Sequence, residues 1–124
     1  MEIPVLNEIM RAPVVEVDLA RIALNVRQIK AMAGPGTQVA AVVKADGYGH
    51  GALGIAPAIM ENGASLLAVA TLSEAVELKQ AYPGYPVLIM GLTPDRLLPY
   101  VLEYGIIQTI DTLAQARLLN RLAS

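Results

Sequence analysis

The chain has 124 residues, of which 55% are hydrophobic, a formal net charge of −2 at pH 7 and no cysteine. This length allows at most one domain, and the weak charge gives no electrostatic reason to bind nucleic acid or a membrane surface. The absence of cysteine excludes a disulfide framework and a thiolate metal site, and no segment is typical of a membrane span or a signal peptide. We therefore expect a cytoplasmic α/β domain at residues 13–124 without a metal site, after an N-terminal arm at residues 1–12.

The first predicted unit is a short strand at residues 14–17 and a helix at residues 19–32. Asp18 is suited to cap this helix, because its carboxylate can accept a hydrogen bond from a free amide of the first turn. One face of the helix should be apolar, since apolar residues recur at intervals of three and four positions: Leu19, Ile22, Val26 and Ile29. The Gly-Pro-Gly sequence at residues 34–36 ends the helix.

The second unit begins with an apolar run at residues 39–43, which is typical of a strand buried on both faces of a parallel sheet. Lys44 stands at the carboxyl end of this run, and a glycine-rich turn follows at residues 47–51. The next predicted helix, at residues 52–61, contains Pro57. Proline removes a backbone donor, so we expect a late start or a kink there.

Three further units repeat the pattern, with strands at residues 66–70, 87–90 and 106–110. Helices follow them at residues 72–81, from 94 to before 105, and at 113–123, with a kink expected at Pro99. The residues suited to cap these helices are Thr71 with Glu74, Thr93, and Thr112 with Gln115. The four βα units that begin at residue 39 are spaced by about twenty residues and fit either an open doubly wound sheet or half of a closed barrel. A complete barrel of eight units takes about 250 residues.

Lys44 is the candidate functional residue, because ligands bind at the carboxyl ends of the strands in both architectures. Apolar surroundings favour the neutral amine of a lysine, and a neutral amine can form a Schiff base with an aldehyde. The position alone favours the other interpretation, a solvated lysine at a strand end. The residues around Lys44 add a further signal.

Residues 41–51 read AVVKADGYGHG and resemble the cofactor-lysine segment of the alanine racemases almost letter for letter. The resemblance continues at residues 15–19, 62–64, 67–71, 74–75 and 86–91, and it extends from Ala12 to the end of the chain. This span corresponds to about the first third of that family's enzymes. The resemblance therefore implies the N-terminal part of a (β/α)8 TIM-type barrel, truncated before the later strands and a C-terminal β domain.

The resemblance also implies site residues. Lys44 would be bound covalently to pyridoxal phosphate and would be one of two groups that move the α-proton of the substrate. Tyr48 matches the tyrosine whose hydroxyl bonds the cofactor phosphate, while Val42 and Met90 would line the cofactor pocket or form plain barrel core. The other lysines, Lys30 and Lys79, are expected on solvated outer faces.

The turn after Lys44 contains other polar residues. We expect Asp46 to organise the turn, because aspartate bonds nearby backbone amides. His50 is the one histidine of the chain, and no carboxylate near it in the sequence supports a general-base role, so we expect a structural role. The glycines should let the backbone turn sharply and approach a phosphate.

The implied function is the interconversion of L- and D-alanine, which supplies D-alanine for the cell wall, by a homodimeric parent enzyme. In that family the second catalytic base, a tyrosine, lies on the C-terminal β domain of the partner subunit. We therefore expect this chain to be an incomplete fragment that is inactive alone. The alternatives are a serine racemase on the same barrel, a non-catalytic pyridoxal-phosphate-binding protein, and a truncated product without independent function.

Overall fold

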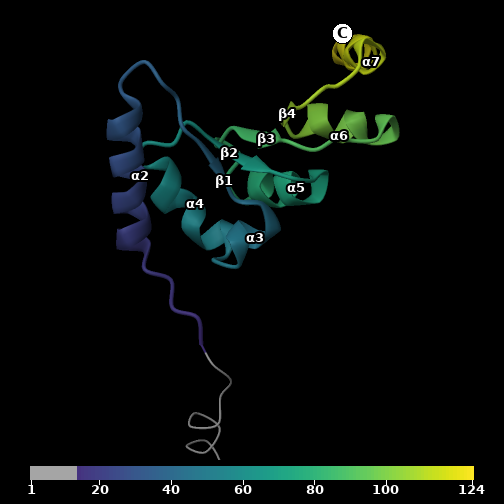
Figure 1. Cartoon of the computed structure of the whole chain (residues 1–124). Helices are drawn as coiled ribbons and strands as arrows, with labels where there is room; N and C mark the ends of the chain where they lie inside the picture. Colours follow the sequence, from purple (N-terminus) through teal and green to yellow (C-terminus); the bar gives the residue numbers. More distant parts are fainter. Residues whose placement is uncertain (1–13) are drawn as a thin grey trace, which may run out of the picture.

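The computed structural model describes residues 14–124, and the predicted arm at residues 1–12 lies outside the described residues. Four parallel strands form one sheet: β1 (Ala40–Val42), β2 (Leu66–Val69), β3 (Val87–Ile89) and β4 (Ile107–Gln108). Their order in the sheet is their order in the chain, β1-β2-β3-β4 (Figure 1). An open doubly wound sheet contains a reversal of strand order, and these four strands contain none.

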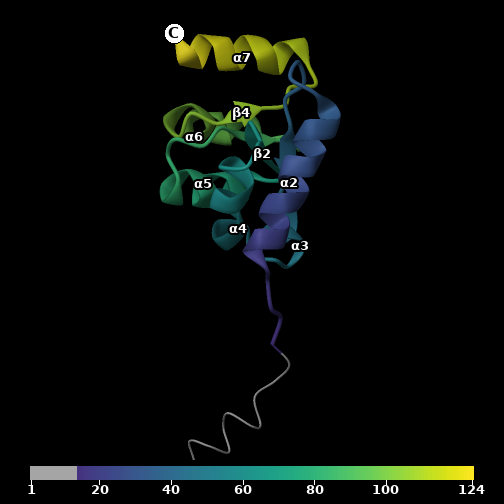
Figure 2. The same cartoon turned by 90° about the vertical axis from the view of Figure 1, so that its left-hand side faces the viewer.

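The helices alternate with the strands as predicted. They are α2 (Leu19–Ala33), α3 (Lys44–Tyr48), α4 (Ala52–Met60), α5 (Leu72–Ala81), η1 (Asp95–Leu97), α6 (Leu98–Glu103) and α7 (Leu113–Ala123). Three predicted caps are confirmed, because the side chains of Asp18, Thr71 and Thr112 each accept a hydrogen bond from the amide three residues later. Figure 2 shows α7 lying across one end of the molecule, beyond β4 and α6.

The predicted strand at residues 14–17 is wrong. These residues have no regular secondary structure, and Val14 and Val15 are 77% and 78% exposed. A strand needs a neighbour for its amides and carbonyls. In the described part of the chain β1 pairs with β2 alone, and residues 14–17 form no ladder with either.

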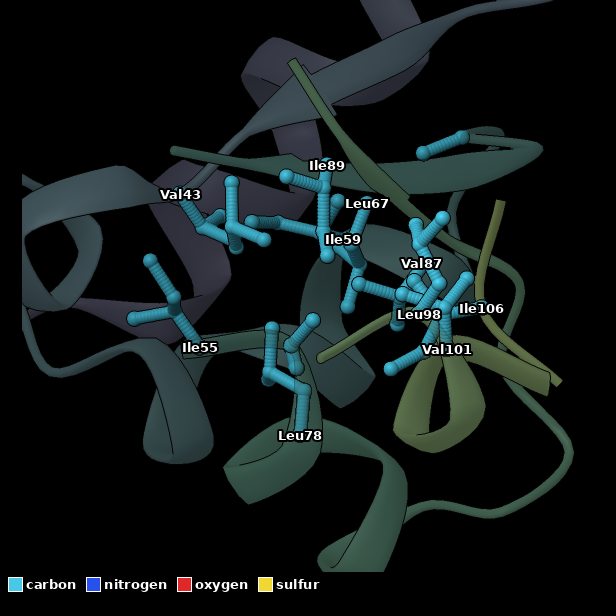
Figure 3. Close-up of a cluster of buried hydrophobic side chains, with 14 residues drawn as sticks. Val43, Ile55, Ile59, Leu67, Leu78, Val87, Ile89, Leu98, Val101 and Ile106 are labelled. Atoms are coloured by element: carbon cyan, nitrogen blue, oxygen red, sulfur yellow. The ribbon is translucent and has the colours of Figure 1, made fainter. Parts of the chain in front are cut away.

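The hydrophobic core lies between one face of the sheet and helices α4, α5 and α6 (Figure 3). Leu67, Val87 and Ile89 point from the strands into this layer and are fully buried. The helices contribute Ile55, Ile59, Leu78, Leu98 and Val101. Because side chains alternate along a strand, the remaining strand residues face the other side of the sheet.

That other face is open in residues 14–124, which corrects the expectation that the strand at residues 39–43, observed as β1, is buried on both faces. Ala40 is exposed and Val42 is 39% exposed. One face of β1 is exposed because β1 lies at an edge of the sheet and the core helices α4, α5 and α6 all pack on the opposite face. On α2, likewise, Ile22 and Val26 pack toward the core while Leu19 and Ile29 are about half exposed.

The helix predicted after residue 93 begins later than expected, because a 3-10 turn precedes it. Thr93 is buried and does not cap it; its hydroxyl donates to Oε1 of Gln108 at 2.5 Å. A 3-10 turn, η1, comes first, and Pro99 then falls in the first turn of α6. A missing amide at that position costs no helical hydrogen bond, so the expected kink at Pro99 is absent.

Candidate functional site

Lys44 lies at the carboxyl end of β1, at the edge of the sheet where the other three strands also end. The hydrogen-bond ladder between β1 and β2 extends to Val43, the residue before Lys44, since the amide of Val43 donates to the carbonyl of Ala68 at 2.8 Å. Lys44 is half-buried, and its amine has no hydrogen-bond or ion-pair partner among residues 14–124. The structure therefore presents an unengaged primary amine at the predicted functional edge.

The other two lysines differ from this pattern and from the prediction that they are solvated. Both are half-buried. The amine of Lys30 donates to the carbonyls of Gly34 and Thr37. The amine of Lys79 donates to the carbonyls of Pro83 and Tyr85, at 2.7 and 3.1 Å. Each amine donates to carbonyl oxygens of the residues that follow its helix. A lysine near the carboxyl end of a helix can reach these oxygens, which have no helical donor. Lys44 is the lysine with a free amine in the described part of the chain.

The segment after Lys44 is a left-handed turn of helix. The φ angles of Ala45, Asp46, Gly47 and Tyr48 are 51°, 54°, 64° and 53°. For residues other than glycine this conformation costs about 1–2 kcal/mol each. Such strained segments persist where surrounding contacts fix them, and they concentrate at functional sites.

Asp46 supplies two of these contacts, which confirms the prediction that it organises the turn. Its carboxylate Oδ1 accepts from the amide of Ala52 at 2.9 Å, at the start of α4, and its carbonyl accepts from the amide of Gly51 at 2.9 Å. His50 has the predicted structural role, since its Nδ1 lies 3.0 Å from the carbonyl oxygen of Gly47 and donates to it. The turn is thereby tied to the first turn of α4.

Gly47 is the glycine that this turn requires most. It has positive φ and is buried, and a Cβ placed there would lie 2.9 Å from Cδ1 of Ile55 and 3.3 Å from the amide nitrogen of Ala52. The expected sharp turn is confirmed here. An approach of this backbone to a phosphate stays a prediction.

The sequence places Glu74 in a helix cap with Thr71 and within the resemblance, but it does not predict the contact of Glu74 with the turn. Its Oε2 accepts from the amide of Ala45 at 2.9 Å, and its Oε1 accepts from the hydroxyl of Thr71, also at 2.9 Å. Glu74 and Ala45 are 29 positions apart. The available signal was the Thr71–Glu74 spacing, which predicts a local cap and gives no hint of the contact with the turn.

The other predicted site residues occupy two places. Val42 and Met90 are 39% and 37% exposed. The strand register puts Val42, Ala68 and Leu88 side by side on the open face of the sheet, and Met90 follows two residues after Leu88. Tyr48 is 60% exposed, on the turn itself.

Two hollows lie near this edge, and neither is lined by Lys44, Tyr48, Val42 or Met90. One, of about 360 Å³, lies between the Lys44 turn, α4 and α5, and includes Glu74 and Glu77 in its wall. The other, of about 680 Å³, lies between α5 and the η1–α6 segment. No group of three or more histidines, aspartates or glutamates that could hold a metal is found within residues 14–124.

The profile of the family described as "Alanine racemase, N-terminal domain" matches residues 17–124. The chain belongs to this family. It is 45% identical over 108 residues to an alanine racemase of Clostridium tetani, a match that covers 87% of this chain and 28% of that protein. The chain thus spans less than a third of the length of the curated relative.

Solved structures of the family agree in fold. An alanine racemase of Clostridium difficile 630 superposes with a TM-score of 0.76 at 32% identity, over 86% of this chain and 28% of that one. An alanine racemase of Bacillus anthracis with bound L-Ala-P gives 0.78 at 33% identity, over 90% and 30%. These alanine racemase neighbours confirm the predicted fold class, the N-terminal part of a TIM-type barrel.

No helix in residues 14–124 is both long and apolar enough to span a membrane.

Proposed function

We propose that this chain is the cofactor-lysine segment of a pyridoxal-phosphate-dependent alanine racemase, which interconverts L- and D-alanine and supplies D-alanine for the cell wall. The observation that carries this proposal is the unengaged amine of Lys44 at the carboxyl end of β1, in a chain of the alanine racemase family. The curated relative is named alanine racemase. The proposal extends to a cytoplasmic homodimer with residues 13–124 as its partial barrel domain.

The residues of this edge fit such a cofactor. A half-buried primary amine without a partner can bond an aldehyde carbon, and the exposed hydroxyl of Tyr48 can donate to a phosphate. Val42 and Met90 lie on the open sheet face and offer apolar walls. When bound, pyridoxal phosphate supplies an electron sink for the electrons released with the α-proton.

The chain's own residues then have separate tasks. Lys44 holds the cofactor and moves a proton at its Nζ, on one face of the substrate. Tyr48 orients the phosphate, and Val42 and Met90 exclude water from the ring. The contacts of Asp46 and Gly47 keep the turn, and hence Lys44, in one position.

The test is to trap the cofactor by borohydride reduction of the protein incubated with pyridoxal phosphate, followed by peptide mapping. Three lysines occur in the chain, and we expect the label on Lys44. Lys30 and Lys79 are internal controls, because both amines already donate to backbone carbonyls. Label on either of them with Lys44 unmodified would contradict the proposal. Trapping without racemisation by the full-length protein would favour the non-catalytic alternative.

A further inference from the structure

The carboxylate of Glu74 joins the start of α5 to the turn that follows Lys44. Glu74 lies in the first turn of α5, and its two oxygens accept from the amide of Ala45 and the hydroxyl of Thr71, both at 2.9 Å. A hydrogen bond to an ionised carboxylate is stronger than one between neutral groups. The nearby amino terminus of α5 further favours the negative charge.

A purely local role of Glu74 does not account for this arrangement. In a capping box the glutamate carboxylate accepts from the backbone amide of the cap residue. Here Oε1 instead accepts from the Thr71 hydroxyl, and Oε2 reaches a residue on another element. The cap bond from the Glu74 amide to Thr71 is long, at 3.4 Å. The carboxylate thus serves the contact with Ala45 as much as the helix end.

The contact acts on Lys44 through a rigid group. The amide nitrogen of Ala45 belongs to the peptide plane that also contains the carbonyl carbon and Cα of Lys44. Fixing this N–H therefore fixes one side of the Lys44 backbone, from which its side chain departs. Ala45 is also the first residue of the turn with positive φ, at 51°, where an outside contact is needed to hold the strain.

We propose that Glu74 is a positioning residue: its carboxylate holds the Lys44–Ala45 peptide so that the Lys44 amine is presented to the cofactor aldehyde. This inference rests on the proposed function. The geometry assigns Glu74 no contact with the reacting atoms, and its effect passes through the backbone.

The experiment compares Glu74→Ala, Glu74→Gln and the matched control Glu77→Ala in the full-length protein. Glu77 lies one turn further along α5, is exposed and lines the same hollow, so its loss removes the same charge from the same place. Two quantities are measured well below the thermal midpoint. One is hydrogen exchange of the Ala45 amide, and the other is the rate at which borohydride traps pyridoxal phosphate on Lys44 relative to Lys79.

We expect Glu74→Ala to speed exchange at Ala45 and to lower the relative trapping rate at Lys44 by about tenfold, the effect of losing one hydrogen bond to a charged group. Glu74→Gln keeps an oxygen acceptor and should restore most of the rate, and Glu77→Ala should leave it within about twofold, as for an exposed charge. General unfolding would not change the ratio between two lysines in this way.

The outcomes separate the two proposals. An unchanged trapping ratio in Glu74→Ala, with Lys44 labelled, would overturn the positioning role alone. No label on Lys44 in the unsubstituted protein would overturn the proposed function and this inference with it. An equal loss in Glu77→Ala would show a charge effect and would also overturn the positioning role.

Discussion

The hydroxyl of Tyr82 donates a 2.7 Å hydrogen bond to the carbonyl of Leu53. This carbonyl is the one that Pro57, four residues further on in α4, leaves without a helical donor. A tyrosine from the end of α5 therefore completes the ladder of α4. Of the two outcomes predicted at Pro57, a late start or a kink, the late start does not occur, because α4 runs from Ala52 to Met60 with Pro57 inside it.

Tyr82→Phe should lower the free energy of unfolding by about 1–3 kcal/mol, because it leaves a half-buried carbonyl without a donor. Urea unfolding measures the loss. Tyr85→Phe is the matched control, since that ring stacks on Tyr82 with centroids 4.9 Å apart and its hydroxyl has no hydrogen-bond partner in residues 14–124.

The link to Pro57 can be tested by a double-mutant cycle. Pro57→Ala restores an amide that can donate to Leu53, so Tyr82→Phe should cost much less in that background. Equal costs in the two backgrounds would show that the hydroxyl does not substitute for the missing helical bond.

Gly91→Ala should destabilise the sheet by about 1–3 kcal/mol, the range for forcing a methyl group into a packed site. A Cβ at Gly91 would lie 2.5 Å from the carbonyl oxygen of Ala70, so the ends of β2 and β3 would have to separate. At Gly84 a Cβ meets nothing within 4 Å, and Gly84→Ala is the control. Equal unfolding midpoints for the two variants would contradict the predicted clash.

Tyr48→Phe should weaken retention of pyridoxal phosphate by about ten- to hundredfold, as expected for one hydrogen bond to a charged phosphate. The dissociation constant follows from an absorbance titration of the full-length protein. Tyr100→Phe, at another half-exposed tyrosine, should leave the constant unchanged. An unaltered constant in Tyr48→Phe would mean that its hydroxyl points elsewhere.

Burial raises the pKa of Tyr85 above its ordinary value of 10.0, and the charges of Glu61 and Tyr82 raise it further. The folded state therefore keeps this proton longer than the unfolded state. The resulting stabilisation is complete below pH 10 and is lost as the pH rises through the raised pKa. Glu61→Gln should move the phenolate absorbance transition of Tyr85 to lower pH, and an unmoved transition would exclude the contribution of Glu61.

The parts of the fold that local signals decide could be predicted from the sequence. Asp18, Thr71 and Thr112 cap helices because each cap depends on residues three positions apart. The prediction of a strand at residues 14–17 was wrong because a strand needs a neighbouring strand to pair with, and the local sequence pattern does not show whether one is present. Thr93 does not cap a helix because its hydroxyl donates a hydrogen bond to Gln108 of the next strand, β4.

The candidate site shows the same division. The motif located Lys44 and the turn, and the conformational freedom of Gly47 followed from its residue type. The left-handed path through Ala45, Asp46 and Tyr48 could not be predicted, since none of these residues favours it alone. It depends on contacts such as the one from Glu74, which come from a distant part of the chain.

The agreement between strand order and chain order has a kinetic consequence. Each strand after β1 pairs with the strand that precedes it in the chain. Val87 of β3 lies beside Leu67 of β2, and Ile107 of β4 lies beside Leu88 of β3. The loops that must close are therefore short, which speeds folding. A chain that leaves the ribosome amino terminus first can add each strand to a finished edge and need not wait for its last residues. The Lys44 turn gains its Glu74 contact as soon as the second of the four strands and the start of α5 have emerged.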